Sequence, residues 1–234
     1  MKYFIFVGCF GSGISELAIH HATSHALSGP STLVDLDLVN PFFRSAERED
    51  VLSSAGVRLI APPFAMDKIE MAVLSSEVFA VFAKGEGTVV FDVGGDTSGS
   101  VALGRYHVFF EKIPRVDLEI LFVVNPYRPL CDTAERAAAM LRAIEKSGRI
   151  KMTGLLNNAN LAWDTTPEDI LFGYDLIKSL SLMTDRPVYG TAGIQATLEE
   201  FLARPGLDAR YTGKAIPFAP VMRRTWDAFI KKGL

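Results

Sequence analysis

The sequence predicts an α/β protein with three layers, in which a mainly parallel sheet lies between two layers of helices. Short apolar runs alternate with longer helical patterns along the whole length of 234 residues. Several of the apolar runs, such as the segment 118–124, are hydrophobic at nearly every position, which is typical of strands covered on both faces. We see no internal repeat, linker or low-complexity segment, so the elements predict a single domain spanning residues 1–234.

The individual elements follow from the apolar periodicity and from the turn residues between runs. Strands are expected at 3–7, 31–35, 57–60, 88–92, 118–124, 152–157 and 187–190. Helices are expected at 15–27, 67–83, 98–111, 132–147, 167–183 and 219–231. The alanine-rich helix at 132–147 is the best defined, because Asp132-Thr133 precedes it and Gly148 ends it.

Composition narrows the class of protein. The chain is 49% hydrophobic and 22% charged with a net charge of −3, which argues against a dedicated nucleic-acid binder. No apolar run approaches the roughly 20 residues needed to span a bilayer, so a membrane protein is not expected. The two cysteines, Cys9 and Cys131, are too few for a disulfide framework, which together with these features predicts a reducing, cytoplasmic setting.

The first loop is the strongest motif. Strand 3–7 runs into Gly8-Cys9-Phe10-Gly11-Ser12-Gly13-Ile14-Ser15, which fits the Walker A pattern GxxxxGK[ST] at every fixed position except the lysine, here Ile14. Gly8, Gly11, Ser12 and Gly13 would let backbone N–H groups approach phosphate oxygens, and Ser15 would bind Mg²⁺. Without the ammonium group at position 14, triphosphate binding and hydrolysis are expected to be weakened.

Two other interpretations of this loop stay open. A glycine-rich turn between strand and helix needs no phosphate role at all. Gly11 and Gly13 also form two-thirds of a dinucleotide GxGxxG motif, with Asp35 about 20 residues further on. Glu16 occupies the third glycine position of that motif, however, which disfavours the dinucleotide interpretation.

Acidic residues end two of the expected strands. Asp35 and Asp37 are two positions apart, so both should point to one face, where they could hold Mg²⁺-bound waters or orient an attacking water. They could equally be solvated turn acids. The run Asp92-Val93-Gly94-Gly95 follows an apolar strand and resembles a Walker B aspartate leading into a phosphate-sensing loop. Asp92 would bind Mg²⁺, and an N–H of Gly94 or Gly95 would contact the terminal phosphate.

With these motifs in order, the chain resembles the MinD/ParA/CobQ branch of SIMIBI-class P-loop NTPases (the CobQ/CobB/MinD/ParA nucleotide-binding domain), with a degenerate Walker A loop. The resemblance identifies Asp35-Leu36-Asp37 with the family's DxD-like element and suggests Asn157 or Asn158 as the residue that recognises the base. It implies ATP or ADP and Mg²⁺ as cofactors, a nucleotide-dependent homodimer and a client protein. Many relatives carry a second lysine at the position of Cys9, so both lysines are missing here. Arg44 and Arg105 are the sequence candidates for a substitute cation.

The leading hypothesis is therefore a nucleotide-dependent switch or accessory ATPase whose hydrolysis is weak or absent. The alternatives are a non-catalytic interaction module that retains the fold, and a dinucleotide-binding enzyme. Two further features have mainly structural interpretations. The first helix carries His20, His21 and His25, which form a polar face rather than a metal site. The basic amphipathic segment 221–232 is expected to pack on the sheet rather than to lie on a membrane.

Overall fold

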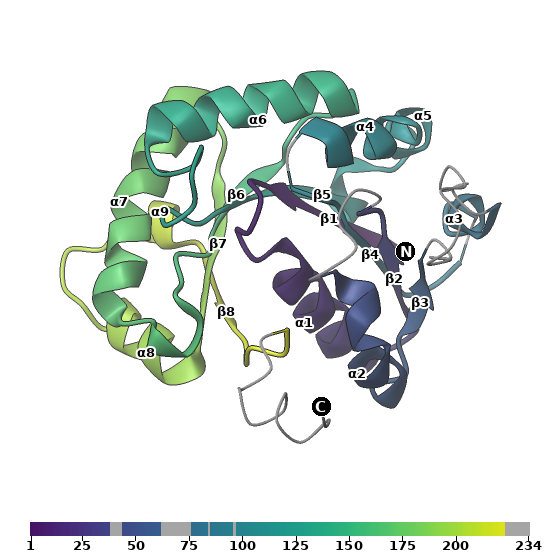
Figure 1. Cartoon of the computed structure of the whole chain (residues 1–234), viewed down its shortest axis with the longest axis horizontal. Helices are drawn as coiled ribbons and strands as arrows, with labels where there is room; N and C mark the ends of the chain where they lie inside the picture. The colour runs from purple at the N-terminus through teal and green to yellow at the C-terminus, as the bar shows by residue number, and fades with distance from the viewer. Residues whose placement is uncertain (38–43, 62–75, 84, 96, 223–234) are drawn as a thin grey trace, which may run out of the picture.

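The computed structural model describes residues 1–37, 44–61, 76–83, 85–95 and 97–222 (Figure 1). In this part of the chain, eight strands form one sheet in the order β3-β2-β4-β1-β5-β6-β7-β8, and every neighbouring pair is parallel. The strands are β1 (Lys2–Gly8), β2 (Ser31–Asp35), β3 (Arg58–Ile60), β4 (Thr88–Asp92), β5 (Leu118–Val124), β6 (Gly154–Asn157), β7 (Val188–Gly193) and β8 (Lys214–Pro217). The mainly parallel sheet expected from the sequence is confirmed.

Helices connect successive strands. They are α1 (Ile14–Ala26), α2 (Glu49–Ser54), α3 (Ser76–Ala80), α4 (Thr97–Gly104), α5 (His107–Phe110), α6 (Ala134–Gly148), α7 (Pro167–Thr184), α8 (Gln195–Leu202) and α9 (Ala209–Thr212), with short 3₁₀ turns at Ser45–Arg48, Arg115–Asp117 and Ala162–Asp164. The expected capping of two helices is present. Thr133 accepts a hydrogen bond from the N–H of Arg136 at the start of α6, and Thr166 forms a capping box with Asp169 at the start of α7.

Two apolar clusters lie on opposite faces of the sheet, which gives the three layers. Along β1, Tyr3, Ile5 and Val7 point into a cluster shared with α4, α6 and α7. Phe4 and Phe6 point the other way, into a cluster shared with α1 and α2. Figure 1 shows α4 and α6 on one side of the sheet and α1 and α2 on the other. The three-layer α/β/α fold is therefore confirmed, and its cause is the alternation of large apolar side chains along central strands.

Several element boundaries differ from the sequence expectation. The expected helix 98–111 is divided into α4 and α5, with the fully buried Tyr106 between them. Strand β8 and helices α2, α8 and α9 were not expected, because β8 is a short, largely exposed edge strand and the helices are short. Within the expected helix 67–83 the structure has α3, and residues 62–75 lie outside the described residues. Residues 219–222 are not helical, and the remainder of the expected helix 219–231 also lies outside them.

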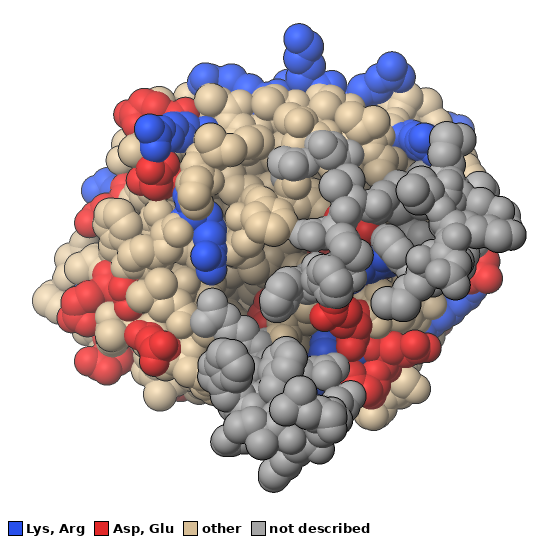
Figure 2. All heavy atoms as spheres, in the orientation of Figure 1, with Lys and Arg blue, Asp and Glu red and all other residues tan. Residues whose placement is uncertain are grey.

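The surface in the view of Figure 1 carries both signs of charge. Figure 2 shows Lys and Arg side chains along the α6 edge and Asp and Glu side chains around α8. No single sign of charge covers the described part of this face. Among the described residues, no helix combines the length and apolar character required to cross a membrane.

Candidate functional site

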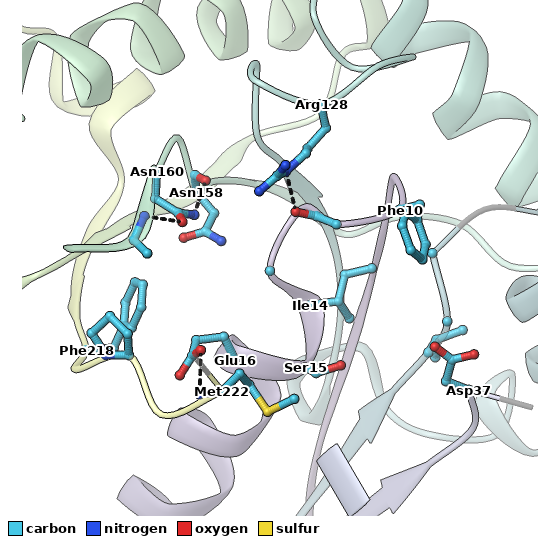
Figure 3. A pocket seen from close by; sticks show the side chains of 17 residues that line it. Phe10, Ile14, Ser15, Glu16, Asp37, Arg128, Asn158, Asn160, Phe218 and Met222 are labelled. Carbon is cyan, nitrogen blue, oxygen red and sulfur yellow. Dashed lines mark hydrogen bonds between the residues drawn. The ribbon is translucent and has the colours of Figure 1, made fainter. Parts of the chain in front are cut away.

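A cavity of about 350 Å³ lies at the edge of the sheet where the parallel strands end, a volume within the range of small-molecule sites (Figure 3). Its wall is formed by the loop between β1 and α1, Asp37, residues 93–95 after β4, the loops after β5 and β6, and residues 218–222 after β8. Loops from non-neighbouring parts of the sequence meet there because every strand of a parallel sheet ends at the same edge. The cavity is therefore the candidate ligand site.

The loop after β1 forms one side of the cavity through its backbone. Gly11 has φ 72° and Gly13 has φ 89°, a left-handed conformation that favours glycine. A Cβ atom on Gly13 would lie 2.3 Å from Nδ2 of Asn158, so a side chain there would collide with the opposite wall. Helix α1 begins directly after Gly13 without a side-chain cap, which leaves its first N–H groups available to an anion.

Asn157 and Asn158 have different positions, although they are adjacent in sequence. Asn157 is fully buried, and its side chain serves the fold by donating to the carbonyl of Ile170 (3.2 Å) and accepting from the N–H of Ala159 (3.1 Å). Asn158 lines the cavity and donates from Nδ2 to the carbonyl of Ser12 at 2.7 Å. Its Oδ1 is buried and has no hydrogen-bond partner among the described residues. Of the two asparagines, Asn158 is thus the one in the cavity wall, and it carries an acceptor that no described residue uses.

Asp35 and Asp37 do not share the cavity, contrary to the expectation from their spacing. Asp37 lines it, whereas Asp35 is 1% exposed and lies behind the wall. Asp35 accepts hydrogen bonds from Nε of Arg44 (2.9 Å), from the N–H of Ala46 (3.1 Å) and from the N–H of Asp37 (3.0 Å). Strand β2 ends at Asp35, so the alternation of sides does not continue to Asp37. In this structure the hydrogen bonds of Asp35 anchor residues 44–46 to the end of β2.

Asp92 ends β4 beside Asp35, with which it is paired in register. It is 1% exposed, and it accepts a hydrogen bond from the N–H of Ser45 at 3.3 Å and one from Ser15. Burial raises the pKa of Asp92 to about 7, and the charge of Asp35 adds to the effect, while the hydrogen bonds from Ser45 and Ser15 oppose it. A nearby cation would stabilise the charged form of Asp92, which burial and Asp35 disfavour.

Gly94 and Gly95 let the loop after β4 pack against its neighbours without side chains. A Cβ on Gly94 would lie 2.7 Å from Oδ1 of Asp37, and one on Gly95 would lie 2.6 Å from Cα of Phe10. The backbones of this loop and of the loop after β1 are therefore in direct contact. Both glycines line the cavity, so their N–H groups lie at the same site as the first turn of α1.

The structure does not place either sequence candidate for a substitute cation in the cavity. Arg44 is 3% exposed and is ion-paired with Asp35, and Arg105 is exposed at the end of α4 and does not line the cavity. The arginine that does line it is Arg128, in the loop after β5, whose Nε donates to the carbonyl of Gly11 at 2.8 Å. Sequence reasoning could have found Arg128, because it follows the buried strand 118–124 by only four positions and that strand must end at the same edge.

Glu16 and Asn160 are two further lining residues that the sequence did not suggest as site residues. Glu16 accepts hydrogen bonds from the N–H groups of Val221 and Met222, and so attaches the segment after β8 to the start of α1. Burial raises the pKa of Glu16, and these hydrogen bonds partly oppose the shift. Asn160 donates to the carbonyl of Asn158 at 2.8 Å and shapes the loop after β6.

The two cysteines, whose small number predicted no disulfide framework and a reducing setting, form one disulfide between Cys9 and Cys131. They are separated by 122 residues, with Cα atoms 6.4 Å apart, and both are buried. They meet because β1 and β5 are neighbours, with Gly8 opposite Val123, which places the loops after these strands side by side. The bond attaches the loop that carries Arg128 to the glycine-rich loop, and it removes the argument for a reducing setting that rested on cysteine usage.

Comparisons with solved structures identify the fold. FtsY from Mycoplasma mycoides aligns with a TM-score of 0.53 and 14% identity over 82% of this chain and 59% of that one. FtsY from Thermotoga maritima, a cell division protein, gives 0.52 and 19% over 82% and 62%. The signal recognition particle receptor FtsY from Elizabethkingia anophelis, in complex with GDP, gives 0.50 and 15% over 82% and 56%.

This chain therefore covers less than two thirds of the length of those structures. No protein-family model and no curated protein matches the sequence. The structural likeness shows that the chain has the α/β fold of these FtsY structures.

Proposed function

We propose that this protein is a nucleotide-binding switch or accessory protein that binds ATP or ADP with Mg²⁺ and hydrolyses ATP weakly or not at all. The observation that carries the proposal is the glycine cradle. The backbone between Gly11 and Ser15 and the loop of Gly94 and Gly95 face one cavity, at positions where a Cβ on Gly13 or Gly95 would collide with a neighbour. Such exposed backbone N–H groups at a helix N-terminus suit phosphate oxygens.

The residues present also fit Mg²⁺. Ser15 and Asp37 line the cavity, and Asp92 lies behind Ser15 and is hydrogen-bonded to it. Hydroxyl and carboxylate oxygens are the ligands Mg²⁺ takes, usually together with water and phosphate. A bound Mg²⁺ would neutralise phosphate charge. It would also stabilise the ionised carboxylate of Asp92 and so lower the raised pKa of that group.

Adenine is the proposed base, with Asn158 as the residue that meets it. Its Nδ2 is already used by the carbonyl of Ser12, which fixes the orientation of the amide and leaves Oδ1 as an unpartnered acceptor. The 6-amino group of adenine can donate to such an oxygen, whereas guanine has a carbonyl oxygen at that ring position. Guanine remains the competing base, because one of the similar FtsY structures holds GDP.

Weak hydrolysis follows from the residues in the two lysine positions. Ile14 has no charge to place on the terminal phosphates, and Cys9 is buried in the disulfide with Cys131. Within the P-loop proteins, the acidic and glycine motifs support a MinD/ParA-like protein. We accordingly propose a nucleotide-dependent homodimer that acts on a client protein. Composition supports the cytoplasm as its setting, and the Cys9–Cys131 disulfide is the observation against that setting, because such bonds are rare in reducing compartments.

Isothermal titration calorimetry tests the proposal. The protein is titrated with ATP, ADP, GTP and GDP, each with and without Mg²⁺. We expect saturable binding of the adenine nucleotides that weakens when EDTA is present, and analytical ultracentrifugation should show dimers only with bound nucleotide. No heat of binding with any of the four at millimolar levels would remove the proposal, and a preference for GTP and GDP would reverse the assignment of the base.

A second candidate function is a docking module that does not depend on nucleotide. Exposed apolar side chains occur on three of the loops that contribute to the cavity wall, namely Phe10, Leu130, Leu161 and Trp163. Exposed apolar side chains on such loops favour contact with another protein. Asp92→Ala and Gly13→Asp should each abolish nucleotide binding. A client that still binds both variants with unchanged affinity would favour the docking module, and a client lost together with the nucleotide would favour the switch.

A further inference from the structure

Arg128 is held against the glycine-rich loop by its own loop. After β5, the N–H of Arg128 donates to the carbonyl of Asn125 at 3.0 Å, and the N–H of Cys131 donates to the carbonyl of Arg128 at 3.1 Å. Cys131 is in turn bonded to Cys9. Two turn hydrogen bonds and a covalent link therefore fix the backbone of this arginine relative to the loop of the proposed nucleotide site.

The side chain of Arg128 lies along Gly11 and extends over the cavity. Its Nε donates to the carbonyl of Gly11 at 2.8 Å, and a Cβ on Gly11 would lie 3.4 Å from both Cδ and Nε of the arginine. A guanidinium group has five N–H donors, and this contact uses one of them. Figure 3 shows the rest of the group at the rim of the cavity, above the loop and opposite Asn158.

The charges around the cavity show what this arginine supplies. Glu16, Asp37 and Arg128 are the charged residues that line the cavity in the described part of the chain, so Arg128 is its single cation there. Polyphosphate binding without a positive group would be opposed by these acids. The lysine positions at 9 and 14 supply no such group, and Arg44 is paired with Asp35.

We propose that Arg128 is the polyphosphate-binding cation of this site and replaces, from the loop after β5, the lysine missing from the glycine-rich loop. The inference rests on the proposed nucleotide function and names the group within it that binds the phosphates. The contact with Gly11 orients the guanidinium, and its remaining N–H donors form charge-assisted hydrogen bonds with phosphate oxygens. The ligand class is a nucleoside di- or triphosphate, in preference to a nucleoside or a monophosphate.

The test compares the affinities of ligands that carry decreasing numbers of phosphate groups, in the wild type and in matched variants. ATP, ADP, AMP and adenosine are titrated, with Mg²⁺, into the wild type, Arg128→Gln and Arg128→Lys. Arg136→Gln is the control, because it removes an equal charge from an exposed arginine on α6 that is paired with Asp132. Circular dichroism and thermal melting establish that each variant is folded.

We expect Arg128→Gln to weaken ATP and ADP binding by about 10- to 100-fold, the range of one charge-assisted hydrogen bond, and to leave adenosine unchanged. Arg128→Lys should recover part of the loss, and Arg136→Gln should behave as wild type. Unchanged ATP affinity in a folded Arg128→Gln protein would overturn the inference, as would an equal loss for ATP and adenosine, which would mean that the arginine acts on the base or on loop shape. If the wild type bound none of the four ligands, the proposed function itself would fail.

Discussion

Replacing Ile14 by lysine tests whether the glycine-rich loop retains its phosphate geometry. Ile14 is 6% exposed and packs with Phe6 and Leu17 in the cluster beneath α1, yet it also lines the cavity. Full burial of an isoleucine contributes about 1.5–3 kcal/mol. A lysine can keep its aliphatic stem on the same apolar surface and extend its ammonium group into the cavity, so Ile14→Lys should lower the free energy of unfolding by only about 1–2 kcal/mol.

The expected gain appears with the ligand. A charge-assisted hydrogen bond contributes about 1.5–3 kcal/mol, which corresponds to roughly 10- to 150-fold in the dissociation constant for ATP. Calorimetry with ATP and adenosine measures the affinity, and a coupled phosphate assay measures turnover. Ile14→Met is the matched control, because it preserves the apolar volume without adding a charge. Turnover should appear or rise. If folded Ile14→Lys binds ATP no more tightly than Ile14→Met, then the backbone of the loop no longer presents phosphate-binding geometry and the reasoning fails.

Three other predictions concern the described structure. Burial, with nearby positive charges, lowers the pKa of His21 from 6.5 to about 3. The unfolded state therefore takes up the proton first as the pH drops. The free energy of unfolding should fall by up to about 5 kcal/mol between pH 6.5 and pH 3. Chemical denaturation should show a flatter dependence in His21→Phe, and parallel curves would contradict the assignment. Burial acts to raise the pKa of Glu145, but hydrogen bonds from a backbone amide, an arginine and a lysine outweigh it, and the net shift is downward. The Glu145 carboxylate therefore contributes fully to the free energy of unfolding above pH 4.5, and this contribution is lost in acid. Glu145→Gln should lower the free energy of unfolding in urea by about 1–3 kcal/mol at pH 7. The difference between variant and wild type should disappear in acid. Gly95→Ala should weaken nucleotide binding about tenfold or more, because its Cβ would meet Phe10 and displace a phosphate-facing loop, whereas Gly29→Ala, which has no atom within 4 Å of the added Cβ, should not.

The sequence by itself determined the fold class and the order of the motifs. Five of the strands begin and end within one residue of the expected positions, since a buried parallel strand such as 118–124 is a nearly continuous apolar run between polar turns. The glycine positions in the first loop were also legible from their spacing, and the left-handed backbone found at Gly11 and Gly13 favours glycine. These signals are local, and a local signal can be recognised without knowing what packs against it.

Only the tertiary structure decided which side chains meet. The spacing of Asp35 and Asp37 indicated two carboxylates on one face, but the end of β2 and the ion pair with Arg44 separate them. The pairing of Cys9 with Cys131, across 122 residues, depends on β1 and β5 being neighbours in the sheet. The same neighbourhood places Arg128 on the loop whose lysine is absent. Contacts across such distances in sequence follow from strand order, and strand order is set by the packing of the whole sheet.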